Sequence, residues 1–319
     1  DNLDFEAKLV AVTDKLKGSL CIPEGIDIKK LLDLLHQGER IDAYFGEAGS
    51  AETIDALDLI EKCEADVLAE LTTTDIKTAE PATGYIKKAF RSGKHVVTSN
   101  KGPAALHYHE LKKMAEKNNL LFRIEGTVMS GTPVFSLFEN GLAGNEVRSI
   151  QGILNGTTNF ILTRMEQDNM DYAEALKLAQ EAGYAEADAT ADVEGYDAVA
   201  KIVILSNVLL DGNISPADVR REGITALTRE KILAAKSEGF RYKLIAEARK
   251  AGGRIEASVS PRRLALSDPL AGIMGAHNAL TFDLDLMGKI TIQGAGAGKV
   301  ETGYSILADL LAIHSRLRR

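Results

Sequence analysis

The feature that most constrains the fold is the stretch 198–210, Ala-Val-Ala-Lys-Ile-Val-Ile-Leu-Ser-Asn-Val-Leu-Leu, which is apolar nearly all round. A helix without a polar face is normally buried on every side. Only a chain with a sizeable core can bury such a helix, and 319 residues are enough for about two domains. The sequence therefore predicts a two-domain globular protein with this helix inside.

Two charged residues share one face of that helix. Asp197 and Lys201 are four positions apart with the acid first, which is the favourable order for a helical pair. Burying them costs several kcal/mol of desolvation, which their attraction offsets only in part. One interpretation is a buried ion pair that locks the helix in place. Four carboxylates just upstream favour instead a site for a substrate with an amine and a polarised oxygen; they are Glu186, Asp188, Asp192 and Glu194.

Composition limits the partners. The chain has 45% hydrophobic and 26% charged residues, which is ordinary for a globular protein, and a net charge of −8. It has no basic tract that could follow a phosphate backbone, so we expect no nucleic-acid partner. The longest apolar run, around 202–210, is far shorter than the roughly 20 residues that span a bilayer, so we expect no membrane partner. Cys21 and Cys63 suit a reducing compartment, and we expect a cytoplasmic protein without a transition-metal site.

The first third of the chain alternates short strands with helices. Strands are predicted at 7–13, 65–71, 95–98 and 120–124, and helices at 51–63, 81–92 and 104–118. This alternation predicts an α/β fold with a parallel sheet of the Rossmann type. Ligands bind beyond the carboxyl ends of such strands, so we expect Asp14, Thr72 and the Asn100-Lys101 pair along one edge, where a dinucleotide would lie.

Asp14 ends a strand that would contact the ribose of a dinucleotide. An acid there favours NAD, whereas Lys15 and Lys17 could accommodate the 2′-phosphate of NADP; a plain turn acid explains Asp14 equally well. The usual glycine fingerprint would begin about 20 residues earlier, but only thirteen residues precede Asp14. We therefore expect that the sequence starts inside the domain, without the first strand and its glycine loop, and that the sheet has a gap there.

The second half predicts an α+β domain. Strands at 147–154, 254–266 and 280–292 could form a largely antiparallel sheet, and helices are expected to end near Gln167 and to span 229–237 and 241–251. Asp171 and Glu174 have the spacing of a capping box. The glycine-rich stretch 293–298 is either a loop that approaches a polar ligand or a tight turn. We expect a dinucleotide-binding domain of residues 1–130, completed by 294–319, and a substrate domain of residues 131–293.

The longest motif resembles the signature of a known enzyme family. From Ala179 to Lys201 the chain is similar to the pattern Ala-x3-Gly-Tyr-Ala-Glu-x-Asp-Pro-x2-Asp-Val-x-Gly-x-Asp-x3-Lys of homoserine dehydrogenases, in their short form without a regulatory extension. It departs from the pattern at Ala189, where the family usually has proline. Shorter matches lie at 98–101, 125–133 and 152–159 and in the terminal glycine loop.

The resemblance implies a reaction and a role for each matching residue. Lys201 would donate a proton to the carbonyl of L-aspartate 4-semialdehyde while NADH or NADPH delivers hydride, which gives L-homoserine. Lys101 would lie near the nicotinamide and share the acid/base or positioning role, and Asp197 would orient Lys201 and line the substrate site. The resemblance also implies that Glu186 and Asp192 contact the substrate and that Thr72 and Gly298 contact the cofactor.

The resemblance also implies a bound monovalent cation such as Na⁺ and a homodimer formed through the second domain. The cation ligands would be Glu125 and the backbone carbonyls of Val128, Ser130 and Thr132. Two alternatives remain open. One is another two-domain NAD(P) dehydrogenase of a small amino acid or aldehyde, and the other is a catalytically silent truncated form.

Overall fold

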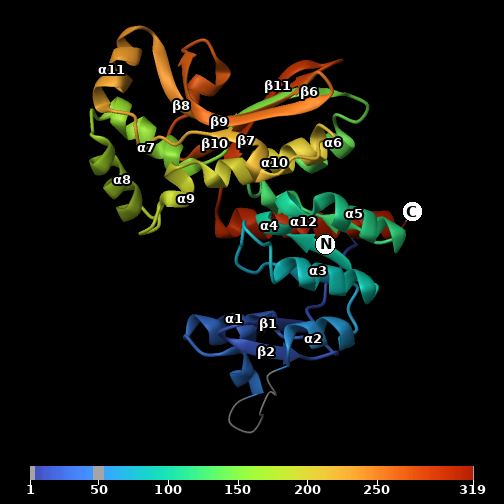
Figure 1. Cartoon of the computed structure of the whole chain (residues 1–319). Coiled ribbons are helices and arrows are strands. Elements are labelled where there is room, and N and C mark those ends of the chain that lie inside the picture. Colours follow the sequence, from blue (N-terminus) through green and yellow to red (C-terminus); the bar gives the residue numbers. More distant parts are fainter. Residues whose placement is uncertain (1–3, 46–53, 319) are drawn as a thin grey trace.

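The computed structural model describes residues 4–45 and 54–318 as a mixed α/β protein with three sheets (Figure 1). A parallel sheet has the order β3 (Val67–Glu70), β4 (His95–Thr98) and β5 (Phe122–Arg123). The helices of this part are α2 (Ala56–Lys62), α3 (Ala82–Arg91), α4 (Lys101–Leu106), α5 (Tyr108–Lys117) and α12 (Lys299–Leu317), with η2 (Glu125–Thr127) after β5. The predicted Rossmann-type parallel sheet is confirmed. Residues 51–53 of the predicted helix 51–63 lie outside the described residues.

Local interactions decide where these elements begin and end. Asn100 caps α4, because its side-chain oxygen accepts from the N–H of Gly102 at 3.0 Å, so the helix begins at Lys101. The single helix predicted at 104–118 is two helices, since His107 has the non-helical φ of −132°. At the other end of the chain, α12 packs on β4 and η2. There Asp309 accepts from Arg123 Nε at 3.0 Å.

The N-terminal strand differs from the prediction. β1 (Ala11–Asp14) pairs antiparallel with β2 (Gly18–Cys21), and within the described ranges it has no ladder with the parallel sheet. The turn explains this pairing, because Asp14 accepts from the N–H groups of Leu16 and Lys17 at 2.8 Å and Gly18 has a φ of +96°. α1 (Ile28–His36) and η1 (Ile41–Phe45) pack on this hairpin. The sequence predicts that a gap separates this strand from the parallel sheet. It does not predict that the strand pairs with β2 in a hairpin.

The third sheet has six strands in the order β11-β10-β6-β8-β9-β7. They are β6 (Val147–Ile153), β7 (Val219–Arg221), β8 (Phe240–Ala251), β9 (Arg254–Ala265), β10 (His277–Leu284) and β11 (Gly288–Ala295). All neighbours are antiparallel except β7 and β9, so the predicted largely antiparallel sheet is confirmed. The accompanying helices are α6 (Phe135–Asn140), α7 (Gly156–Gln167), α8 (Tyr172–Glu181), α9 (Thr190–Val193), α10 (Tyr196–Leu209) and α11 (Arg229–Ser237), with η3 (Pro216–Asp218) and η4 (Pro269–Gly272). No helix in the described part of the chain is long and apolar enough to cross a membrane.

Two predictions for this sheet are wrong. The stretch 241–251 is not a helix but most of β8. Its Leu, Ala, Glu, Lys and Arg residues have a high intrinsic helix propensity. In the fold, however, all of them pair with β9, and part of the strand also pairs with β6. These pairings between strands outweigh the helix propensity. The stretch 280–292 is two strands, β10 and β11, joined by a turn in which Gly288 has a φ of +68°. The predicted capping box of Asp171 and Glu174 is confirmed at the start of α8.

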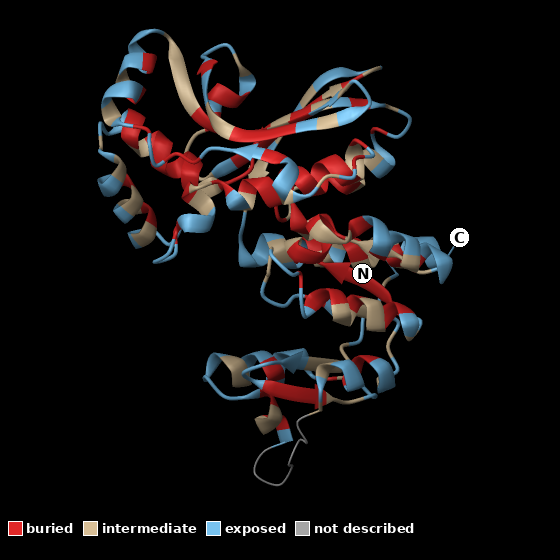
Figure 2. Ribbon diagram, in the orientation of Figure 1, coloured by how far each residue is buried: buried red, intermediate tan, exposed pale blue. Residues whose placement is uncertain are grey.

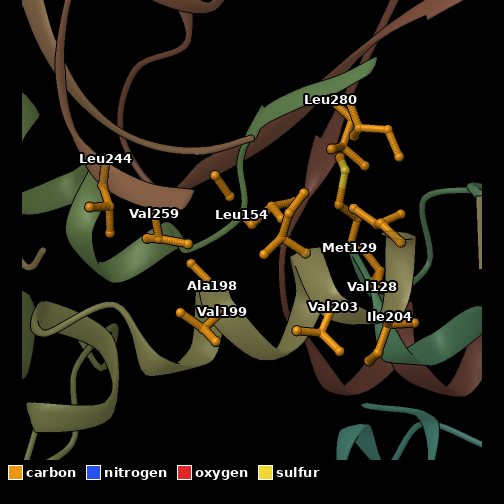
Figure 3. Close-up of a cluster of buried hydrophobic side chains, with 14 of the residues drawn as sticks. Val128, Met129, Leu154, Ala198, Val199, Val203, Ile204, Leu244, Val259 and Leu280 are labelled. Atoms are coloured by element: carbon orange, nitrogen blue, oxygen red, sulfur yellow. The ribbon is translucent and has the colours of Figure 1, made fainter. Parts of the chain in front are cut away.

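The helix that is apolar nearly all round is buried, as predicted. Every residue of α10 from Ala198 to Asn207 is buried, and Figure 2 shows this helix mostly in red. Side chains of the six-stranded sheet, among them Leu244 and Val259, lie above Ala198 and Val199 (Figure 3). α4 packs against α10 from the other part of the molecule. α10 therefore joins the two parts through one core.

A buried lysine in β8 has only neutral hydrogen-bond acceptors among residues 4–45 and 54–318. Lys243 is 1% exposed, and its Nζ donates to Asn159 Oδ1 at 2.7 Å and to the carbonyl of Ile273. Burial, aided by the nearby charge of Arg241, lowers the pKa of Lys243 from the usual 10.5 to about 7.

We predict that Lys243 makes the stability of the fold depend on pH. Between pH 7 and 10.5 the folded protein binds fewer protons at this site than the unfolded chain, so the free energy of unfolding rises with pH. From pH 7 to 9 the rise is about 2 kcal/mol. Lys243→Met is expected to lose this rise, whereas Lys231→Met, at an exposed position of α11, is expected to keep it. Urea unfolding across this range measures both, and equal pH slopes in Lys243→Met and the unmodified protein contradict the prediction.

Candidate active site

The charged pair at the start of α10 lies where the two parts of the molecule meet. Lys201 Nζ donates to Asp197 Oδ2 and to the carbonyl oxygen of Leu154, both at 2.7 Å. Lys201 is 7% exposed, so this ammonium is almost completely withdrawn from water. An ammonium has three donors, and these contacts engage two of them. The predicted pairing of Asp197 with Lys201 is therefore present, and within the described part of the chain one donor is left for another acceptor.

A second lysine reaches the same carboxylate from the parallel-sheet part. Lys101, the first residue of α4, places its Nζ 3.2 Å from Asp197 Oδ1. Burial by itself raises the pKa of Asp197, but the charges of Lys201 and Lys101 outweigh it and hold the pKa well below its usual range. One carboxylate thus lies between two ammonium groups that come from different parts of the fold.

Asn155 completes this cluster, and sequence reasoning did not single it out. It is 4% exposed and caps α7, accepting from the N–H of Thr158 at 2.9 Å. Its Nδ2 donates to Asp192 Oδ1 at 2.6 Å and to Asp197 Oδ2 at 3.0 Å. Burial raises the pKa of Asp192, and the hydrogen bond from Asn155 partly opposes that rise. The available signal was an asparagine at a helix start inside the matching stretch 152–159, which indicates a cap but not these contacts.

The other acidic residues of the motif do not join the cluster. Glu186 is exposed on the loop between α8 and α9, where its backbone carbonyl accepts from Gln180 Nε2 at 3.2 Å. Asp188 accepts from the N–H of Thr190 at 3.0 Å, and Glu194 lies 3.5 Å from Arg221 Nη1. Of the three predicted substrate carboxylates, the structure brings Asp192 and Asp197 to Lys201 and leaves Glu186 apart.

The carboxyl ends of β3 and β4 form an edge beside Lys101. Glu70 is 2% exposed and accepts from the N–H of Thr72 at 2.9 Å and from Thr98 Oγ1 at 3.0 Å. Asn100 Nδ2 donates to the carbonyl of Thr72 at 3.1 Å. Thr72 and Lys101 therefore lie on one strand-end edge, and the buried Glu70 carboxylate fixes its shape.

The two other predicted cofactor residues, Gly298 and Asp14, lie at the ends of elements, Gly298 before α12 and Asp14 at the end of β1. Gly298 precedes α12 with a φ of +149°, a backbone conformation that residues with a side chain rarely adopt, which favours glycine at this position. Asp14 lies in the turn of the β1–β2 hairpin and not in the parallel sheet. The turn acid is thus observed, and a contact between Asp14 and the cofactor stays a prediction.

The segment predicted to hold a cation begins at a buried acid. Glu125 is 2% exposed, and its carboxylate accepts from three N–H groups at the start of α6, those of Val134, Phe135 and Ser136 at 2.6, 2.9 and 2.8 Å. Further along, Val128 is buried and Ser130 Oγ lies 2.8 Å from Thr302 Oγ1, while Thr132 Oγ1 is 3.5 Å from the carbonyl of Ala295. In residues 4–45 and 54–318 no group of three or more His, Cys, Asp or Glu side chains is arranged to hold a metal ion. A cation here would rely on backbone carbonyls.

Comparison with known proteins decides the family. A family model described as homoserine dehydrogenase matches residues 133–311. The NAD(+)-dependent homoserine dehydrogenase of Pseudomonas canavaninivorans is 46% identical over 322 residues, which cover 99% of this chain and 89% of that protein. The chain belongs to the homoserine dehydrogenase family.

Solved homoserine dehydrogenases share the fold. A putative homoserine dehydrogenase from Archaeoglobus fulgidus aligns with a TM-score of 0.85 at 38% identity, covering 97% of this chain and 89% of that one. A hyperthermophilic archaeal homoserine dehydrogenase in complex with NADPH aligns with a TM-score of 0.80 at 27% identity, covering 96% and 88%. Homoserine dehydrogenases are NAD(P)-dependent oxidoreductases that reduce L-aspartate 4-semialdehyde to L-homoserine in threonine and methionine biosynthesis. The predicted family and reaction are confirmed over the alternative of another dehydrogenase.

We predict that Asn155 influences the acidic limb of the pH–rate profile through Asp192. Asn155→Ala removes a hydrogen bond that lowers the pKa of Asp192, so this pKa, already raised by burial, rises further. The acidic limb of kcat/KM is expected to move to higher pH. Asn140→Ala, which changes an exposed asparagine of α6, serves as the control. An unmoved limb in Asn155→Ala means that Asn155 serves only as a helix cap.

Proposed function

We propose that Lys201 is the proton donor in the reduction of L-aspartate 4-semialdehyde. The observation that supports this most is the hydrogen bonding of the Lys201 ammonium. It donates to Asp197 Oδ2 and to the carbonyl oxygen of Leu154, both at 2.7 Å, and within the described part of the chain its third N–H remains for another acceptor. NADH or NADPH, when bound, supplies the hydride. Negative charge then develops on the aldehyde oxygen, and a fixed ammonium in a buried place stabilises that charge and supplies the proton.

Asp197 and Lys101 maintain this arrangement in our proposal. Asp197 stays ionised because its pKa is held low, so it can orient both ammonium groups and balance their charge. The side chain of Lys101 is 29% exposed, against 8% for Lys201, which makes Lys101 the more accessible of the two. Lys101 would therefore contact the substrate and the nicotinamide side and add a second positive charge near the reacting oxygen.

Asp192 and Glu186 would bind the ammonium group of the substrate. Asn155 holds Asp192 in the cluster. Glu186 lies outside the cluster, so the loop between α8 and α9 would have to close over the substrate to bring it in. Ala189, where the family usually has proline, leaves this loop more conformational freedom.

The cofactor would lie along the edge of Thr72 and Lys101 and beside Gly298, with Asp14 reaching its ribose. The support is the strand-end edge itself, which the buried Glu70 holds through Thr72. One relative is named NAD(+)-dependent and one neighbour is solved with NADPH, so both nucleotides have to be tested. We also propose that a monovalent cation such as Na⁺ binds to Glu125 and to the backbone carbonyls of Val128, Ser130 and Thr132.

We also propose two domains and a cytoplasmic homodimer. The dinucleotide domain comprises residues 1–130 and 294–319, and the substrate and dimerisation domain comprises 131–293; the packing of α12 on β4 and η2 supports this division. The free thiols of Cys21 and Cys63 suit the reducing cytoplasm.

α7 and α10 pack on one face of the six-stranded sheet. The opposite face carries a polar row across neighbouring strands, Thr291, Thr281, Gln151 and Glu247, which supports a contact with a second subunit.

We predict that Lys201→Met lowers kcat by about 10³-fold without loss of the fold, because the general acid is removed while the helix stays apolar. The assay follows NADH or NADPH oxidation with L-aspartate 4-semialdehyde, and circular dichroism checks folding. Lys62→Met is the matched control, since it breaks an exposed Asp/Lys pair of the same spacing. Near-normal turnover in Lys201→Met would leave Lys201 a purely structural role. An unmodified protein that turns over neither nucleotide favours the catalytically silent form.

We predict that sedimentation equilibrium at micromolar concentration gives twice the chain mass of 34.4 kDa. Thr281→Arg places a charge in the middle of the polar row and is expected to shift the protein toward the monomer. Ser237→Arg, at an exposed position of α11, is expected to leave the dimer intact. A monomeric unmodified protein, or a Thr281→Arg variant as dimeric as the control, argues against this interface.

A further inference from the structure

A buried asparagine without hydrogen-bond partners lies beside the proposed active site. Asn278, in β10, is 0% exposed, and neither its Oδ1 nor its Nδ2 has a hydrogen-bond partner in the described part of the chain. Most buried polar side chains of folded proteins are paired, and an exception calls for a specific explanation. By contrast, Asn155, which caps the neighbouring α7, and Asn159 within that helix use both ends of their amides.

The neighbours of Asn278 indicate what can pair with it. Asn278 lies opposite Gly294 in the β10–β11 ladder, and a Cβ on Gly296 would collide with its carboxamide. On the other side is Gly156 at the start of α7, where an added Cβ would lie 3.6 Å from Asn278 Oδ1. Gly156 directly follows Asn155, which binds Asp192 and Asp197. Asn278 thus lies between the glycine loop 293–298 and the proposed catalytic cluster.

We propose that Asn278 is a positioning residue that anchors the glycine loop when NAD(P) binds. Because the side chain is fully buried, the groups that can reach it are the peptide groups of the loop packed on it rather than the cofactor itself. The loop can adjust, since Ala297 and Gly298 are exposed and glycine tolerates many backbone conformations. A small shift of the loop toward the cofactor would let the carboxamide donate to and accept from loop peptides. This inference rests on the proposed function, because it assumes that the loop contacts NAD(P).

The test replaces the amide by an apolar side chain of similar size. Asn278→Leu is expected to keep or raise the melting temperature of the free protein, because two unpaired polar atoms are removed from the interior. Its affinity for NADH or NADPH, measured by nicotinamide fluorescence, is expected to fall about tenfold, since two net hydrogen bonds are lost on binding. Asn145→Leu is the matched control, because Asn145 Oδ1 is also buried without a partner but lies in the turn before β6. The control is expected to bind the nucleotide as the unmodified protein does.

The outcomes separate this inference from the proposed function. If the unmodified protein binds neither nucleotide, the proposed function fails, and the inference fails with it. If the unmodified protein binds and Asn278→Leu binds within twofold of it, the inference alone is overturned. Should Asn278→Leu fail to fold, amide hydrogen exchange in the unmodified protein decides. Slower exchange at residues 295–298 with nucleotide bound supports the anchor, and unchanged exchange refutes it.

Discussion

The arrangement of the site depends on one carboxylate, Asp197, that two lysines share. Lys201 approaches it from the same helix at 2.7 Å, and Lys101 approaches it from α4 at 3.2 Å. Removing one partner of a buried ion pair leaves an uncompensated charge, which costs about 3–5 kcal/mol. Without Asp197, two ammonium groups would also face each other in a place with little water. The same contact therefore stabilises the junction between the two parts and sets the position of the proposed acid.

The apolar surface of α10 makes this contact possible. The helix is buried from Ala198 to Asn207 between the six-stranded sheet and α4, so Asp197 and Lys201 are held at its first turns by a core on both sides. A packed core resists small displacements, because its side chains interdigitate at the density of organic crystals. Lys201 is further fixed by the carbonyl of Leu154, which follows β6. The lysine is thus positioned by a helix, a strand end and an ion pair together.

Sequence reasoning was most successful where local signals and tertiary packing agree. The apolar pattern after Asp197, the capping box of Asp171 and Glu174, and the alternation around β4 each specify one structure, and each is observed. It was wrong at 241–251, where helix-forming residues pair as a strand over the whole length of β9. It missed Asn155 because the contact with Asp192 spans 37 positions. Contacts of that range depend on the fold and leave no local pattern in the sequence.

The two asparagines beside the cluster show how rigidity is distributed around the proposed site. The amide of Asn155 uses both its oxygen and its nitrogen within the chain, because it caps α7 and binds Asp192 and Asp197. These carboxylates are therefore fixed before any ligand arrives. Asn278 is also deeply buried, but its carboxamide has no hydrogen-bond partner among the described residues, and it lies against Gly296 of the glycine loop. Hydride transfer needs a fixed acid but also a cofactor that enters and leaves in every turnover. In our proposal, the fixed cluster around Lys201 and a glycine loop that adjusts when the cofactor binds satisfy both requirements within one site.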